Sequence, residues 1–150
     1  MTRREMREHS FKMLFGVGFY PTEETAGQVA QYFDSPEEDD TNADGAVEII
    51  HQVEMKEEDR AFLIARVEGI AAKIPELDEK INSVAQGWKT RRMGKVELTI
   101  LRQALYEMLY DSEVPEKVAI NEAVDLAKKF GGNDAPAFIN GVLAKLVMTE

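Results

Sequence analysis

The 150-residue chain has no cysteine and is 44% hydrophobic, which suits one globular domain and excludes disulfides and cysteine-based metal sites or nucleophiles. Charged residues interrupt the N-terminal segment and no apolar stretch approaches the ~20 residues that span a bilayer, so we expect a soluble, cytoplasmic protein. The net charge of −10 argues against a polyanionic ligand, but the acidity is local: residues 23–59 hold thirteen acidic residues and one basic residue, whereas the remainder holds fifteen acidic and seventeen basic residues.

Helical periodicity runs through most of the chain. The first helix begins at Thr2, which has capping-box spacing to Glu5, and ends near Gly18. After an acidic loop at residues 37–45, we expect a short helix over residues 47–53. Because no segment shows the period-two pattern of a strand, the predicted fold class is all-α, with about seven helices. The other predicted helices cover approximately residues 22–34, 58–73, 77–88, 95–111, 115–130 and 135–147.

The helix predicted over residues 95–111 differs from the others because apolar side chains cover most of its circumference. Such a helix is usually buried at the centre of a fold. Its remaining polar residues, Glu97, Arg102 and Glu107, must therefore find partners or reach solvent.

Patterns typical of catalysis are absent from the sequence. His9 and His51 lack metal-ligand spacing, and residues 57–59 read as an acidic helix start that suits the helix dipole. The Gly16-x-Gly18 pair has no preceding strand and lacks the rest of a dinucleotide-binding motif. We therefore expect a helical binding protein with no enzymatic activity, no cofactor and no metal.

Two segments could bind an anionic ligand. Arg3, Arg4 and Arg7 lie at helical spacing, and guanidinium groups can fork onto phosphates; alternatively, they only solubilise the first turns of the helix. The second segment is the corner between the last two predicted helices, residues 128–138. There Gly131 and Gly132 could take the positive φ that ends a helix.

The corner offers several groups with binding chemistry. Lys128 lies in the last turn of one helix, Asp134 can cap the next, and Pro136 fits that helix's first turn. A helix N-terminus suits anions, and an exposed Phe138 could stack on an unpaired base. Periodicity also allows Phe138 to pack in the core with Val142, so both interpretations stay open from the residues alone.

The C-terminal half of the chain resembles the NusB family of bacterial transcription antitermination factors. The resemblance rests on ILRQALYEML at 100–109, VPEKVAINEAVDLAKKFG at 114–131 and FINGVL at 138–143, and it extends upstream through GWKTRRMGKVE at 87–97. It implies a single all-α domain of two small packed bundles, about 1–75 and 76–150. It also implies a non-enzymatic adaptor that pairs with the small-subunit ribosomal protein NusE. The pair would bind the single-stranded box A element of nascent ribosomal RNA and help RNA polymerase read through terminators.

The resemblance also implies roles for particular residues. Phe15 and Glu97 match positions that face the ribosomal partner. Ala135, Ala137 and the acidic Glu5 and Glu8 depart from the family pattern and lower the RNA affinity expected of the isolated protein. An alternative function is a helical interaction or self-association module, such as a homodimer, without RNA binding. The positions that match RNA-contacting residues are Arg3, Arg4, Arg7, Lys128, Gly132, Asn133, Asp134 and Phe138.

Overall fold

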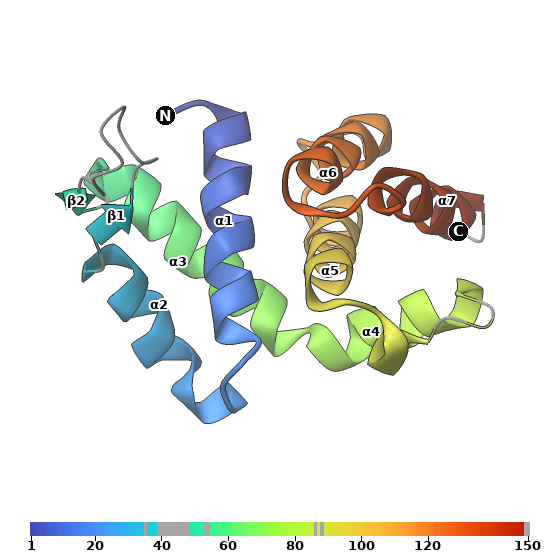
Figure 1. Cartoon of the computed structure of the whole chain (residues 1–150), viewed down its shortest axis with the longest axis horizontal. Coiled ribbons are helices and arrows are strands. Elements are labelled where there is room, and N and C mark those ends of the chain that lie inside the picture. Colours follow the sequence, from blue (N-terminus) through green and yellow to red (C-terminus); the bar gives the residue numbers. More distant parts are fainter. Residues whose placement is uncertain (35, 39–48, 53–54, 86, 88, 149–150) are drawn as a thin grey trace. The chain divides into compact units, whose positions relative to one another are not determined.

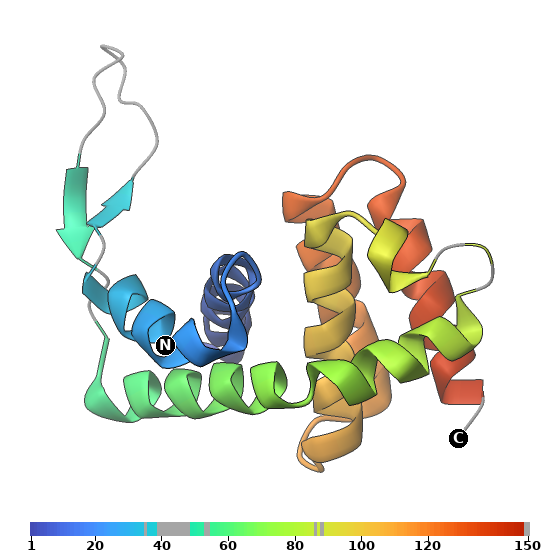
Figure 2. The ribbon, with the colours of Figure 1, turned by 90° about the horizontal axis from the view of Figure 1, so that it is seen from below.

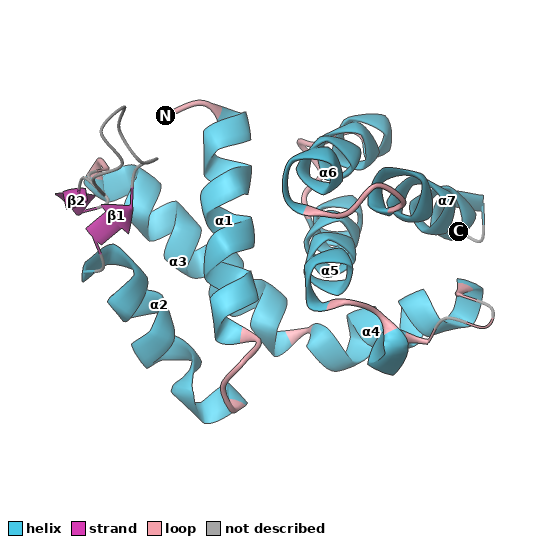
Figure 3. Ribbon diagram, in the orientation of Figure 1, coloured by secondary structure: helices cyan, strands magenta, loops and turns pink. Residues whose placement is uncertain are grey.

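The computed structural model describes residues 1–34, 36–38, 49–52, 55–85, 87 and 89–148, and these residues are mainly helical (Figures 1 and 3). They separate into two compact units, Met1–Glu68 and Gly69–Glu150. The boundary falls within a helix and earlier than the boundary near residue 75 that we expected. The elements in chain order are α1 (Arg3–Val17), η1 (Thr22–Glu24), α2 (Thr25–Asp34), β1 (Pro36–Glu38), β2 (Ile49–Gln52), α3 (Glu57–Ala72), α4 (Ile74–Val84), η2 (Thr90–Arg92), α5 (Lys95–Tyr110), α6 (Glu116–Phe130) and α7 (Ala135–Met148).

Helix α1 begins with the capping box that the sequence predicts. The Glu5 N–H donates to Thr2 Oγ1 at 3.1 Å, and the Thr2 N–H donates to Glu5 Oε1 at 3.2 Å. These two bonds satisfy amide groups that have no partner within the helix. The helix ends at Gly18, whose N–H donates to the Leu14 carbonyl at 3.1 Å. Helix α1 buries an apolar stripe that includes Met13, Leu14 and Val17.

Helix α1 packs against α2 within the first unit. A hydrogen bond of 2.6 Å joins His9 Nδ1 to the Tyr32 hydroxyl, and the two rings meet edge to face. The Arg60 guanidinium of α3 lies 4.6 Å from the centroid of the buried Phe33 ring of α2. Aromatic and cation–π contacts therefore tie the elements of this unit together beside its apolar side chains.

The short helix expected over residues 47–53 is wrong for the part that the structure describes. Ile49–Gln52 forms strand β2, which pairs antiparallel with β1, so that Pro36 faces Gln52 and Glu37 faces His51. Strand pairing joins residues far apart in sequence, and the local apolar spacing that suggested a helix cannot detect it. The expectation that the chain lacks strands fails here as well. The all-α class stands, because the two strands comprise only three and four residues.

Helix α5 is the centre of the second unit, as its nearly uniform apolar surface predicts. It packs against α4, α6 and α7 (Figure 2). Leu101, Ile100 and Leu105 are no more than 1% exposed. Full burial of an aliphatic side chain contributes about 1.5–3 kcal/mol, so this helix supplies much of the unit's stability.

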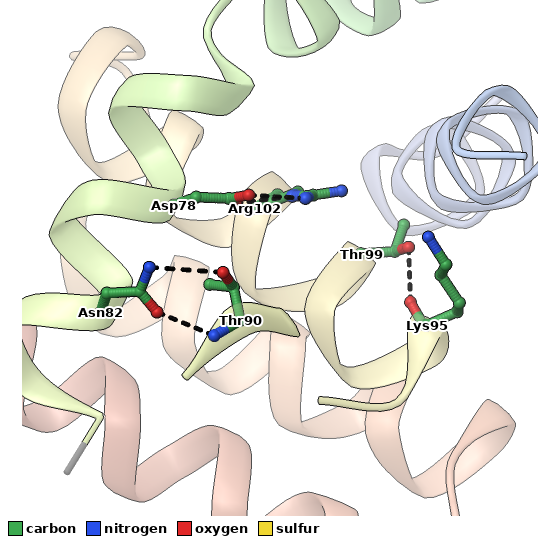
Figure 4. A network of polar contacts seen from close by, with 6 residues as sticks. All are labelled: Asp78, Asn82, Thr90, Lys95, Thr99 and Arg102. Atoms are coloured by element: carbon green, nitrogen blue, oxygen red, sulfur yellow. Dashed lines mark hydrogen bonds and ion pairs between the residues drawn. The ribbon is translucent and has the colours of Figure 1, made fainter. Parts of the chain in front are cut away.

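Polar contacts fix α4 and the following turn against α5 (Figure 4). Arg102 of α5 donates two hydrogen bonds to the Asp78 carboxylate of α4, at 2.8 and 2.7 Å. Asn82 of α4 exchanges two hydrogen bonds with Thr90 of η2, at 2.8 and 3.3 Å. The Arg102–Asp78 pair shows how one polar residue of the largely apolar helix α5 is satisfied, because the guanidinium donates both hydrogen bonds to a single carboxylate.

Candidate functional sites

The three arginines of α1 have different environments in the first unit. Arg3 and Arg4 are exposed in the first turn, whereas Arg7 is only 9% exposed. Arg4 and Arg7 each take part in further interactions. An arginine this deeply buried needs polar or charged partners. Of the three, Arg3 and Arg4 are therefore the side chains most accessible to a ligand.

The corner between α6 and α7 is an exposed polar turn of the second unit. Lys128, Gly132, Asn133 and Asp134 are all exposed. The Ala135 N–H donates to the Gly132 carbonyl at 3.1 Å, which closes the turn just before α7 begins.

The structure corrects the conformation expected of the corner glycines. Neither Gly131 nor Gly132 has a positive φ; Gly131 has φ −97° and ψ 176°, an extended conformation open to any residue. Gly131 is instead required by close packing. A β-carbon there would lie 2.6 Å from the Ala135 β-carbon and 2.8 Å from the Ala127 carbonyl oxygen. The glycine therefore allows the end of α6 to approach the start of α7.

Phe138 lies at the edge of the apolar face of α7. Its neighbour Ile139 is fully buried, and Val142, one turn further, is 7% exposed. Phe138 itself is half-buried. The residue is thus partly covered by the unit and partly accessible, in the first turn of the helix. Phe138 is therefore neither a fully buried core residue nor a fully exposed one, and both interpretations from the sequence apply in part.

Phe15 belongs to an aromatic row on α1. Its ring lies 6.1 Å from the Phe11 ring and meets the Phe19 ring edge to face at 5.1 Å. Phe11 is buried, Phe15 is half-buried and Phe19 is 59% exposed, so the row runs from the interior to solvent. It ends beside a cavity of about 340 Å³ between α1 and α2, lined by Lys12, Met13, Gly16, Val17, Phe19, Tyr20, Gln28, Gln31 and Tyr32.

Phe19 and Tyr20, which is 48% exposed, are candidate binding residues that the sequence reasoning missed. A signal for Phe19 was available, since Phe11, Phe15 and Phe19 recur every four residues, the spacing of one helical stripe, although Phe19 itself lies in the turn after α1. The exposure of Tyr20 depends on the turn after α1 and has no such local pattern.

Glu97 has a local role at the start of α5. It is the third residue of the helix and is half-buried. Its carboxylate occupies the space in which a β-carbon on Gly94, the N-terminal cap, would lie. A carboxylate in the first turn complements the partial positive charge of the helix N-terminus. Glu97 therefore contributes to the fold in addition to any role toward a partner.

Two wider findings concern the described part of the chain. It holds no group of three or more histidine, aspartate or glutamate side chains that could bind a metal ion. None of its helices is both long and apolar enough to cross a membrane.

Fold and sites together define the class: an all-α protein with an exposed polar corner in one unit and an aromatic-rimmed groove in the other. The model of the NusB family matches residues 4–148. The transcription antitermination protein NusB of Lachnoclostridium phytofermentans is 44% identical over 147 residues, which cover 98% of this chain and 99% of that protein. The same-named protein of Agathobacter rectalis is 41% identical, with coverage of 97% and 98%. The chain belongs to the NusB family.

A solved structure supports the fold independently. The chain resembles T. maritima NusB with a TM-score of 0.78, over 99% of this chain and 92% of that one. Only 24% of the residues are identical, so this likeness bears on the fold alone. It agrees with the predicted all-α class.

Proposed function

We propose that this protein is a non-enzymatic, RNA-binding adaptor in transcription antitermination. In this proposal it pairs with ribosomal protein NusE, and the pair binds box A of nascent ribosomal RNA and helps RNA polymerase read through terminators. The observation that carries the proposal is family membership over residues 4–148, shared with relatives named transcription antitermination proteins.

The corner of the second unit supports a single-stranded RNA ligand. Lys128 supplies positive charge, and the exposed backbone of Gly132 and Asn133 offers polar groups beside the half-buried Phe138 ring. Single-stranded RNA is recognised largely by stacking of unpaired bases on aromatic rings, together with polar and charged contacts. Asp134 directly precedes the first residue of α7, and its backbone carbonyl accepts a hydrogen bond from the Phe138 N–H at 3.1 Å.

The arginines of α1 have unequal parts in this proposal. Arg3 and Arg4 supply accessible positive charge for phosphates. Arg7 is buried, and its contribution would be to hold the N-terminal segment in place or to reach RNA at its edge.

Phe15 and Glu97 are the residues proposed to face NusE. The accessible row that joins Phe15 to Phe19 offers aromatic area of the kind that anchors protein interfaces. Glu97 also complements the start of α5, so Glu97→Gln is a better probe than Glu97→Lys. The glutamine variant removes the negative charge but keeps a side-chain oxygen that can accept hydrogen bonds, whereas lysine would reverse the charge. We expect Glu97→Gln to weaken NusE binding while lowering the melting temperature by no more than about 4 °C, since a first-turn charge contributes about 0.3–1 kcal/mol. An unchanged affinity would remove Glu97 from the interface.

The decisive experiment captures this protein on immobilised NusE and then titrates the pair with RNA that carries box A or a scrambled version. The adaptor proposal requires tighter binding of box A. Equal binding of both RNAs would overturn it. Capture of NusE without any RNA binding would instead favour the alternative, a helical interaction or self-association module.

Phe138→Ala tests the corner within that assay. If the ring stacks on a base, the change should weaken RNA binding by about 1–3 kcal/mol. Because the ring is half-buried, some loss of stability is also expected, and Phe138→Leu serves as the control that keeps apolar volume but removes the aromatic face. Equal RNA affinity of the leucine variant and the wild type would exclude stacking.

A further inference from the structure

A second cationic surface lies in the same unit as the corner. The segment Lys89–Lys95, here called the basic turn, contains Lys89, Arg91, Arg92 and Lys95 and no acidic residue. All four basic side chains are exposed. The segment includes η2 and leads directly into α5.

The backbone of the basic turn is held in place by α4 (Figure 4). The Thr90 N–H donates to Asn82 Oδ1 at 2.8 Å, and Asn82 Nδ2 donates to Thr90 Oγ1 at 3.3 Å. Lys89 Nζ donates to the Asn82 carbonyl at 2.8 Å. Inside the turn, the Arg92 N–H donates to the Lys89 carbonyl at 2.8 Å. A ligand that binds the arginines therefore meets a backbone that is already ordered, which lowers the entropy cost of binding.

The two arginines of the turn keep their charge available. Within the described residues, neither the Arg91 nor the Arg92 guanidinium has an ion pair. Asp78, one helical turn before Asn82 on α4, is paired with Arg102 at 2.7 Å, whereas the Glu97 carboxylate lies against Gly94 of the turn itself. Guanidinium groups present a planar fork of donors that matches phosphate oxygens.

The basic turn and the corner lie at the same end of the second unit. Helices α5 and α6 pack together and are joined by only five residues, 111–115, so they run antiparallel; α6 and α7 likewise turn back at residues 131–134. The start of α5, the end of α6 and the start of α7 therefore meet at one end, as Figure 2 shows. Lys117 and Lys145, at the start of α6 and in the last turn of α7, mark the opposite end.

We propose that the basic turn binds the phosphate backbone of the RNA strand that contacts the corner, with Arg91 and Arg92 as the phosphate-binding residues. The proposal rests on the RNA-binding part of the proposed function. Phosphate contacts carry no sequence information, so the turn adds affinity and not base preference. Because the basic turn and the corner lie at the same end of the unit, one continuous RNA strand can contact both, which favours RNA over an acidic protein as the ligand.

The test compares two double variants of equal net charge in complex with NusE. Arg91→Gln/Arg92→Gln removes the proposed contacts, and Lys117→Gln/Lys145→Gln removes two exposed charges at the opposite end. Binding of a fluorescein-labelled single-stranded RNA with box A, and of its scrambled version, is measured by anisotropy over a range of salt concentrations. Circular dichroism checks that each variant is folded.

The arginine variant should bind both RNAs about 25-fold more weakly at 0.1 M salt, and its salt slope should fall by about 1.4, since each lost single-strand phosphate contact lowers the slope by ~0.7. The lysine variant should bind like the wild type. Equal affinities of the two double variants would overturn the proposal, whether both are weakened or neither is. A wild-type protein without preference for box A would instead defeat the antitermination proposal, while the comparison of the variants would still decide the basic turn.

Discussion

Gly131 and Gly132 are adjacent in the corner, yet the structure predicts opposite responses to a single added methyl group. A β-carbon on Gly131 would lie 2.6 Å from the Ala135 β-carbon and 2.8 Å from the Ala127 carbonyl oxygen. The second of these atoms is backbone and cannot rotate away. A β-carbon on Gly132 would meet no heavy atom within 4 Å. Since neither glycine has a positive φ, the difference between them is purely steric.

We predict that Gly131→Ala lowers the free energy of unfolding by about 1–3 kcal/mol, the usual cost of overpacking a closely packed site. Gly132→Ala should leave stability unchanged or raise it by up to about 1 kcal/mol, because alanine restricts the unfolded chain more than glycine does. For a chain of this size, 1 kcal/mol corresponds to about 2–4 °C in melting temperature. Gly131→Ala should therefore melt roughly 2–12 °C below the wild type.

Urea unfolding and thermal melting, both followed by far-ultraviolet circular dichroism, measure the difference between the two glycine variants. Equal stabilities would refute the steric explanation of Gly131. The Gly132 variant also reports on function. A methyl group on this exposed corner should hinder close approach of RNA, so we expect weaker binding of box A RNA at unchanged stability. A variant with full RNA affinity would place the RNA contact away from the Gly132 backbone.

Two further predictions concern charged groups outside the corner. Asp78→Ala leaves the Arg102 guanidinium without its carboxylate partner, and the Arg102 side chain is only 14% exposed, so we expect the free energy of unfolding to fall by about 1–3 kcal/mol. Glu76→Ala, which removes an exposed ion pair, should lower it by less than about 1 kcal/mol. Urea unfolding measures both variants, and equal losses of stability would contradict this ranking. The Thr2 hydrogen bonds lower the pKa of Glu5 below its usual value of 4.5, so this capping contribution is present above the unfolded-state pKa and is lost as pH falls through the folded pKa. Thr2→Pro, which removes the backbone N–H that donates to Glu5, should move the Glu5 pKa back toward 4.5 in an NMR titration, whereas Thr2→Ala keeps this N–H and should move the pKa less. An unchanged pKa in the proline variant would show that the capping box does not set it.

Most helices were predictable because the information that specifies them is local. The capping box of Thr2 and Glu5 and the proline in the first turn of α7 are each contained within a few residues. The central position of α5 was also readable, because a helix that is apolar on nearly every side can satisfy that surface only by burial. The identity of most candidate binding residues came from the family pattern, which is likewise a property of the sequence.

Accessibility and pairing were decided only by the tertiary structure. Arg3 and Arg7 are the same residue type four positions apart, but one is exposed and the other buried, since burial depends on elements distant in sequence. The pairing of β1 with β2 and the steric need for Gly131 are non-local in the same way. Arg91 and Arg92 appeared in the sequence only as part of a basic connector. Their availability as a phosphate-binding pair follows from the hydrogen bonds that hold the turn and from the pairing of Asp78 with Arg102.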